Sequence, residues 1–182
     1  MEGVVRARMW RRIQAFMFDY LVILGYLGVL AVAGFLLTLG PLGAMWSALV
    51  STPWKRDLLA FCSTVLPVIG YFAWTEGSVH CATWGKRRVG LRVVGLGGDR
   101  LGGGQALARS VVKFLPWQMA HTALFHIPGF PMSVTDPPDW TVWVMGTMWV
   151  LVAAYLFGLT KLGGGRTIYD RLSASQVVEA RE

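Results

Sequence analysis

An aspartate inside an apolar run is the first residue that suggests chemistry. Residues 10–21 read WRRIQAFMFDYL, so Asp19 follows Arg12 by seven positions. Seven residues are close to two helical turns, so both side chains would share one helix face, with Ala15 between them. An ionisable side chain inside lipid costs about a few kcal/mol and needs a partner or a proton. Asp19 is therefore a candidate cation or proton site.

Basic residues further along the chain offer Asp19 a partner. Arg109 and Lys113 are four residues apart and would share one face of a helix, near its cytoplasmic start. We expect an ionic cluster of Asp19 with Arg109 or Lys113, with Glu76 as a further member. One interpretation of this cluster is a cation or proton site. The other is a structural ion pair that docks two helices.

Two histidines, His121 and His126, follow on the same predicted helix. Histidine titrates near neutral pH, so the pair suggests a proton path. A relay also needs matched groups, however, and no carboxylate lies near these residues in the sequence. We therefore favour plain interfacial polarity for both histidines.

The rest of the sequence offers little for catalysis. Cys62 and Cys81 lack the spacing of a zinc site, and we expect two free thiols. We find no nucleophile elbow, no paired catalytic carboxylates and no metal-ligand spacing. The sequence predicts a protein that is not an enzyme and that has no metal site and no cofactor.

The composition indicates the environment in which these residues must be positioned. Hydrophobic residues make up 54% of the chain and charged residues 15%, with a mean hydropathy of +0.50. Four apolar segments each come near the roughly 20 residues that a helix needs to cross the hydrocarbon core: residues 13–39, 58–74, 106–127 and 140–162. We expect an all-α polytopic membrane protein with about four transmembrane helices and one domain over residues 1–182.

Proline interrupts two of these segments, at Pro67 and Pro116. A membrane helix accepts such a residue when its neighbours satisfy the freed backbone groups. We therefore expect both segments to remain helical.

Lysine and arginine predict the orientation of the chain. They gather in the N-terminal arm, in the loop between the second and third segments, and in the tail. The tail contributes Lys161, Arg166, Arg171 and Arg181. The first outer loop holds only Lys55 and Arg56, and the other outer loop holds neither lysine nor arginine. Both termini are therefore expected in the cytoplasm.

The loop between the second and third segments reads TWGKRRVGLRVVGLGGDRLGGGQALARS. Its alternating apolar residues and the turn-like Gly97-Gly98-Asp99 predict a short hairpin or loop on the inner membrane surface. Four basic residues would contact lipid phosphates there: Lys86, Arg87, Arg88 and Arg92. Nucleic-acid binding is disfavoured, because these residues have no interleaved aromatic platform.

Three stretches of the chain together resemble the RDD family of bacterial membrane proteins. They are RRIQAFMFD at the first segment, the central loop quoted above, and RTIYDRLSASQVV in the tail. By this resemblance the arginine and two aspartates that name the family are Arg12 (or Arg11), Asp19 and Asp170. The resemblance also implies the bacterial inner membrane, and for this family transport of an undefined ligand has been suggested.

The tail departs from the family pattern at two places. Tyr169 stands where the family often has histidine, and Ala174 stands where glycine is common. Alanine adopts the backbone conformations of a tight turn less readily than glycine, so a tight turn is less expected there. From its position, Asp170 is expected to bind Arg87, Arg88 or Arg92 and to latch the tail to the central loop.

Two functions remain open at this stage. The first is a small transporter or a cation- or proton-coupled carrier, with site candidates Arg12, Asp19, Arg109, Lys113 and Asp170. The second is a membrane scaffold or accessory subunit that binds lipid and a partner protein. The chain is short for a complete carrier. A homo-oligomer or a membrane protein partner is therefore expected with either function.

Overall fold

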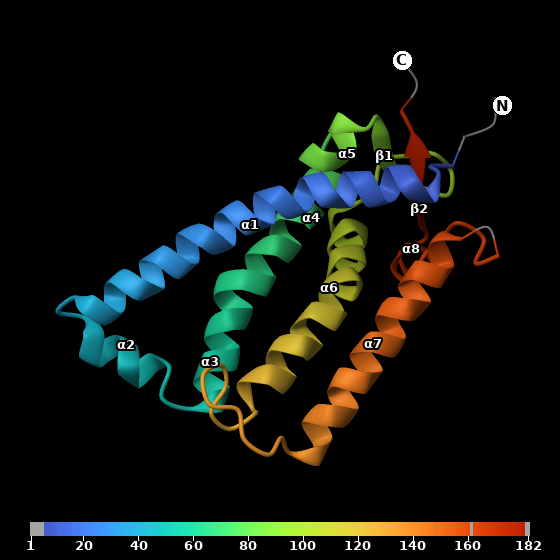
Figure 1. The fold of residues 1–182 in the computed structure, drawn as a ribbon. Helices are drawn as coiled ribbons and strands as arrows, with labels where there is room; N and C mark the ends of the chain where they lie inside the picture. Colours follow the sequence, from blue (N-terminus) through green and yellow to red (C-terminus); the bar gives the residue numbers. More distant parts are fainter. Residues whose placement is uncertain (1–5, 161, 181–182) are drawn as a thin grey trace. The chain divides into compact units, whose positions relative to one another are not determined.

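The chain is mostly helical, and the computed structural model describes residues 6–160 and 162–180. The elements, in chain order, are α1 (Met9–Leu39), α2 (Gly43–Leu49), α3 (Pro53–Ala60), a π-helical turn η1 (Phe61–Val65), α4 (Leu66–Glu76), α5 (Trp84–Arg88), β1 (Leu91–Gly95), α6 (Gly103–Phe125), α7 (Asp139–Leu159), α8 (Ile168–Leu172) and β2 (Ser175–Glu179). Figure 1 shows them coloured along the sequence.

Three helices in the described residues are long and apolar enough to cross a membrane: Met9–Leu39, Pro53–Glu76 and Asp139–Leu159. The third predicted segment forms α6, which is not among them. Its polar and charged side chains, Arg109 and Lys113 included, lower its hydropathy. Three membrane spans are therefore supported, and a fourth span, formed by α6, remains a prediction.

The observed helices begin earlier than predicted. The second predicted segment began at Leu58, but the helix starts at Pro53, where Thr52 caps it by accepting from the Lys55 amide at 3.4 Å. Proline at the first helical position is favourable because its missing N–H would have no partner there. Asp57 therefore lies inside the helix and not at its start.

The chain divides into two compact units. The first consists of Met1–Ile23, Val68–Lys113 and Val152–Glu182, and the second of Leu24–Pro67 and Phe114–Leu151. All the candidate site residues except the two histidines belong to the first unit.

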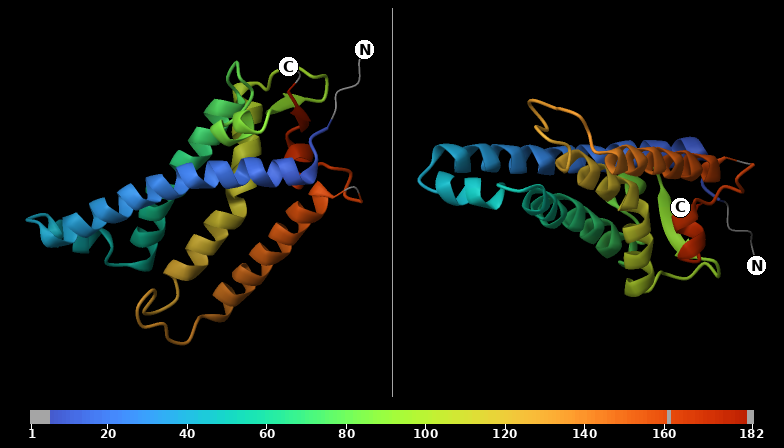
Figure 2. Two further views of the ribbon diagram at one scale, coloured as in Figure 1. Left: turned by 45° about the horizontal axis from the view of Figure 1, so that its top comes forward. Right: turned by 90° about the horizontal axis from the view of Figure 1, so that it is seen from below.

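A small antiparallel sheet in the first unit joins segments that are far apart in the sequence. β1 pairs with β2 in the register Leu91 with Glu179 and Gly95 with Ser175, and Figures 1 and 2 show the two strands side by side. The N-terminal arm adds to the other edge of β2, where the Ala7 amide donates to the Val177 carbonyl at 3.0 Å.

The central segment forms one strand and a turn, where a short hairpin or loop was predicted. The strand is present, but it pairs with the tail, and only a single bridge joins Val94 to Arg100 across the turn. An alternation of apolar residues with a period of two predicts a strand, but it does not identify the distant strand that pairs with it. Leu91, Val93 and Val177 are buried in the core beneath this sheet.

Each proline within a helix is compensated by a tyrosine hydroxyl. Pro67 cannot donate to the carbonyl of Ser63, four residues earlier, and the Tyr26 hydroxyl donates to that oxygen at 2.5 Å. In the first unit the Tyr155 hydroxyl donates at 2.5 Å to the carbonyl of Val112, which is four residues before Pro116. Neighbouring side chains thus satisfy the freed backbone groups, as expected.

Candidate functional site

Asp19 is fully buried in the first unit, and neutral donors bind it. Its Oδ2 accepts from the Thr83 hydroxyl at 2.6 Å. Its Oδ1 accepts from the Gly85 amide at 2.8 Å and from the Tyr71 hydroxyl at 3.2 Å. The carboxylate of α1 thus caps the first turn of α5, where backbone amides point outward and favour an acceptor.

The close approach of α5 to α1 depends on small residues. Ala15, Asp19 and Ile23 are the buried residues of α1, and their spacing of four places them on one face. A Cβ on Gly85 would contact the Ala15 carbonyl and would lie 2.8 Å from Cγ of Asp19. Glycine is therefore the residue that lets the α5 amide reach the carboxylate.

Arg109 lies at the centre of a second group of buried charges. One guanidinium nitrogen pairs with Glu76, and the other donates to Oδ1 of Asp170 at 2.7 Å. Nε donates to the Ser175 hydroxyl at 3.1 Å. The guanidinium carbon also lies 5.0 Å from the ring centroid of Tyr169, so the tyrosine found in place of histidine offers a cation–π contact.

Glu76 and Asp170 each have two cationic partners. Lys86 binds the other oxygen of Glu76 at 2.9 Å. Arg12 binds the other oxygen of Asp170 at 2.6 Å. Both carboxylates are inaccessible to solvent, with side-chain exposures of 0%. Such paired geometry is what makes a buried charge tolerable.

The tail turn is built around Asp170. Thr167 and Asp170 form a capping box at the start of α8, in which Asp170 accepts from the Thr167 amide at 3.1 Å. Burial alone would raise the pKa of Asp170. Arg109 and Arg12 outweigh this effect and hold the pKa well below its usual range. Asp170 is therefore an anion that joins α8 to α1 and α6.

The sequence-based partner assignments were wrong in two cases. Asp19 was expected to pair with Arg109 or Lys113. The Arg109 guanidinium binds Glu76 and Asp170 instead, and hydroxyl and amide donors bind Asp19. Asp170 was expected to bind Arg87, Arg88 or Arg92, but Arg12 and Arg109 bind it. The tail does dock on the central loop, through the β1–β2 ladder instead of an ion pair.

Lys113 also lies in this region. Its ammonium is 3.5 Å from the ring centroid of Phe72 and 5.8 Å from that of Phe16. The predicted neighbourhood of Asp19, Arg109, Lys113 and Glu76 is thus formed within one unit, although with different pairings. The Arg12–Asp170 pair and the roles of Thr83 and Gly85 were missed.

The predicted lipid-contacting residues divide into two groups. Lys86 is 7% exposed and bound to Glu76, so its assignment to lipid phosphates was wrong. Arg87, Arg88 and Arg92 are exposed. Lys86 is buried because it lies on the face of the short α5 that is turned toward Glu76. A run of basic residues in the sequence does not show which of them faces inward.

The remaining sequence candidates have ordinary surroundings, except that the buried Nδ1 of His121 has no hydrogen-bond partner among the described residues. His126 contacts the Thr122 carbonyl through Nδ1 at 2.8 Å, and its ring lies against Trp54 and Trp140. His121 stacks on Phe125. Cys62 and Cys81 are free thiols. Lys161 and Arg181 lie outside the described residues. Among those described, no three His, Cys, Asp or Glu side chains are grouped to hold a metal.

Ala174, which stands where the family has glycine, adopts the conformation that favours glycine. Its φ is 45°, in the left-handed region. The turn between α8 and β2 is therefore kept despite the alanine, and Gln105 supports it by donating to the Ser173 carbonyl at 2.6 Å.

Comparison with known proteins agrees with the geometry. The sequence pattern of the RDD family matches residues 6–174 of the chain. No curated protein and no solved structure matches the chain. The matched region contains Arg12, Asp19 and Asp170, and its apolar helices are those of a membrane-type protein. The chain therefore belongs to the RDD family.

Proposed function

We propose that this protein is a membrane scaffold or accessory subunit whose buried charges hold three distant chain segments together. The observation that supports this proposal is the state of three carboxylates. Asp19, Glu76 and Asp170 are each 0% exposed, and internal donors bind both oxygens of each one. The segments that they connect are the N-terminal helix, the central loop and the tail.

A carrier needs carboxylate oxygens that can exchange between protein donors and cargo. Here a cation at Asp19 would have to displace the Thr83 hydroxyl and the Gly85 amide. Each displaced donor would remain buried without a partner, at about 1–3 kcal/mol. The geometry therefore favours a fixed set of buried polar contacts over a path for cations. We call the contacts of Asp19, Glu76 and Asp170 the polar lock.

The surroundings of the lock suggest what the scaffold contacts. We place it in the bacterial inner membrane with both termini in the cytoplasm, where Arg87, Arg88 and Arg92 would contact lipid phosphates. A hollow of about 500 Å³ in the second unit includes Gly25 and Gly28 of α1. Small residues let helices approach closely in lipid, so a membrane partner or a second copy of the chain would fit there. The proposal includes no enzymatic activity.

The test compares the wild type with Asp19→Asn in proteoliposomes that carry a pH gradient. The scaffold proposal expects neither protein to dissipate the gradient faster than empty liposomes. It also expects the variant to unfold at a lower temperature, because an amide nitrogen would face a donor. Gradient loss driven by the wild type, with cation added, would contradict the proposal.

A cation- or proton-coupled carrier is the second candidate. Asp19 and Glu76 lie in helices that are apolar enough to cross a membrane, and ionisable residues in such helices are candidates for ion pathways. This alternative expects the wild type to dissipate the gradient and expects Asp19→Asn to remain folded but inactive. The same experiment therefore distinguishes the two functions.

A further inference from the structure

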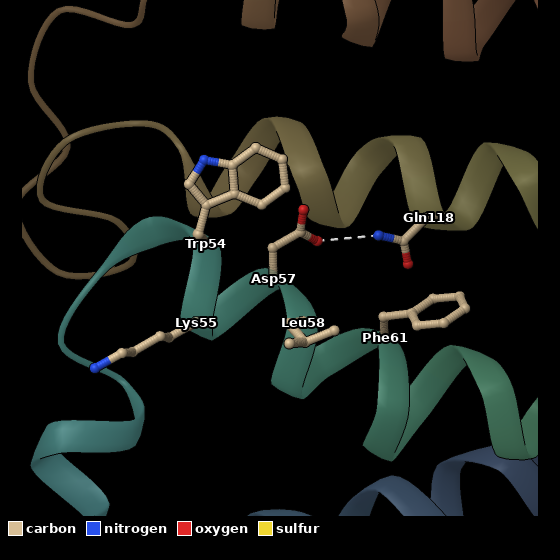
Figure 3. A pocket seen from close by; sticks show the side chains of 6 residues that line it. All are labelled: Trp54, Lys55, Asp57, Leu58, Phe61 and Gln118. Atoms are coloured by element: carbon tan, nitrogen blue, oxygen red, sulfur yellow. Dashed lines mark hydrogen bonds between the residues drawn. The ribbon is translucent and has the colours of Figure 1, made fainter.

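A hollow in the second unit contains a carboxylate that lies outside the polar lock. It has a volume of about 460 Å³ and is lined by Trp54, Lys55, Asp57, Leu58, Phe61 and Gln118. Figure 3 shows these side chains, with Gln118 facing Asp57 from α6. None of the residues that line this hollow belongs to the polar lock, so a ligand bound here is independent of the proposed function.

Asp57 is 5% exposed and has one oxygen left for a ligand. Its Oδ1 accepts from Nε2 of Gln118 at 3.0 Å and from the Thr122 hydroxyl at 3.2 Å. Among the described residues, no donor binds Oδ2. No salt bridge from the described residues neutralises this largely buried carboxylate, so a cationic ligand at Oδ2 would stabilise it.

Gln118 binds the Oδ1 oxygen of Asp57. Because a carboxylate only accepts, the amide nitrogen of Gln118 must be the atom that faces Asp57. The amide oxygen Oε1 then points elsewhere, and it is buried with no donor among the described residues. Oδ2 of Asp57 is therefore the acceptor that is left for a ligand in the hollow.

The nearest cationic side chain on the lining does not neutralise Asp57. The Lys55 ammonium donates to the Ala48 carbonyl at 3.0 Å and to the Ser51 hydroxyl at 3.3 Å. Figure 3 shows the Lys55 side chain extending away from Asp57. Arg56 donates to the Phe125 carbonyl at 3.4 Å and is not on the lining. The Asp57 carboxylate therefore has no cationic partner on this lining.

The other walls are apolar and aromatic. Trp54, Leu58 and Phe61 complete the lining. Aromatic faces attract cations, and apolar walls accept the body that carries the cation. A hydrated metal ion would gain little from these walls, whereas an organic cation would use both parts of the site.

We propose that this hollow binds the primary ammonium group of an organic amine. A primary ammonium can donate an N–H to Oδ2 of Asp57 while its charge offsets that of the carboxylate. A quaternary ammonium has no N–H, so it would form no hydrogen bond with Oδ2. Two sources carry this group: the headgroup of phosphatidylethanolamine, and a free amine from the aqueous phase.

The experiment uses the full chain and separates the two sources. In the first arm, the protein is exchanged into nanodiscs of equal phosphatidylethanolamine and phosphatidylcholine, and native mass spectrometry measures the lipid retained. In the second arm, phenethylamine binding to the detergent-purified protein is measured by equilibrium dialysis, with phenyltrimethylammonium as the quaternary comparison. Asp57→Asn removes the charge, and Asp139→Asn, which is exposed in the same unit, is the matched control.

We expect the wild type and Asp139→Asn to bind the primary amine or the ethanolamine lipid at least about tenfold more tightly than the quaternary compound. We expect Asp57→Asn to lose that preference. Leu58→Trp provides a second test, because this exposed residue can fill the hollow while the bonds of Asp57 stay intact. Thermal unfolding identifies any variant that fails to fold.

Binding in the first arm alone identifies the lipid headgroup as the source, and binding in the second arm alone identifies a free amine. Either result supports the site if Asp57→Asn and Leu58→Trp abolish it. The proposal is overturned if neither ligand binds, if the quaternary compounds bind equally well, or if folded Asp57→Asn binds as the wild type does.

Discussion

Arg12 and Asp170 are 158 positions apart in the chain, and Nη2 of Arg12 donates to Oδ2 of Asp170 at 2.6 Å. Arg12 also donates to the Gly165 carbonyl at 3.0 Å, so one side chain holds the whole turn before α8. The start of α1 and the tail are thereby fixed to each other. By the resemblance, Arg12 (or Arg11) and Asp170 are the arginine and second aspartate that name the family, and here Arg12 and Asp170 are direct partners.

Removal of the Arg12 charge should weaken the fold strongly. Arg12→Gln leaves Asp170 with one of its two cations, and breaking a buried pair costs about 3 kcal/mol. The free energy of unfolding, measured by denaturant titration in detergent, should fall by that order. Arg8→Gln is the control, because Arg8 is exposed on the same arm and should change stability by less than about 0.5 kcal/mol. Equal effects of the two substitutions would contradict the pairing.

Addition of one methyl group at Gly85 should separate α5 from Asp19. The new Cβ would lie 2.8 Å from Cγ of Asp19, and such overpacking costs about 1–3 kcal/mol. Gly70→Ala is the matched control, since Gly70 lies inside α4 with nothing within 4 Å of a new Cβ. That control should raise stability by about 0.5–1 kcal/mol. Thermal midpoints that move in the same direction for both variants would count against the close contact.

The Tyr155 hydroxyl should matter only while Pro116 is present. Tyr155→Phe leaves the Val112 carbonyl without its donor and should cost about 1–3 kcal/mol. In a Pro116→Ala background the backbone amide at position 116 can serve that carbonyl, so the same change should cost less. A double-mutant cycle on unfolding free energies measures the difference. Identical costs in both backgrounds would show that the hydroxyl does not compensate for the proline.

Acid should weaken the attachment of the tail by protonating Asp170, which binds Arg12 and Arg109. The pKa of Asp170 is lowered in the folded protein, because Arg109 and Arg12 outweigh the effect of burial. The unfolded chain therefore binds this proton at a higher pH, near the ordinary value of about 4. The stabilisation from Asp170 is complete above that pH and is lost as the pH falls through the folded pKa.

Asp170→Asn should remove this acid dependence, since it deletes the titrating group. The thermal midpoint of the wild type, recorded from pH 7 to pH 3, should fall more steeply than that of the variant. Asp99→Asn, which changes an exposed acid in the same unit, should keep the wild-type slope. A variant with Asp170→Asn that shows the full wild-type slope would refute this role.

The sequence predicted three of the membrane helices, because their apolar runs are long and carry few charges. It also indicated the neighbourhood of Asp19, Arg109 and Glu76 from spacing on helix faces. It did not predict which charges pair, since helical spacing fixes a face and not the partner across it. The partner depends on how α5 and α8 turn, and these are only five residues long.

Some of the missed features did have a local signal. Thr167 and Asp170 have the spacing of a capping box, which predicts a helix start and orients the aspartate. Thr83 before a basic segment has the same capping function, with its hydroxyl accepting from the Lys86 amide at 3.3 Å. The pairing of β1 with β2 had no such signal, because strand partners 80 residues or more apart are set by the tertiary fold.

The accessibility of Asp19 distinguishes a closed scaffold from a carrier. Dicyclohexylcarbodiimide is an apolar reagent that adds to carboxyl groups it can reach within a membrane protein. Peptide mass spectrometry of the labelled protein in liposomes measures adduct at Asp19, with guanidinium-unfolded protein as the positive control. A scaffold with a closed polar lock predicts adduct at Asp19 only after unfolding. Adduct in the folded protein that added cations suppress would contradict it and would support a carrier.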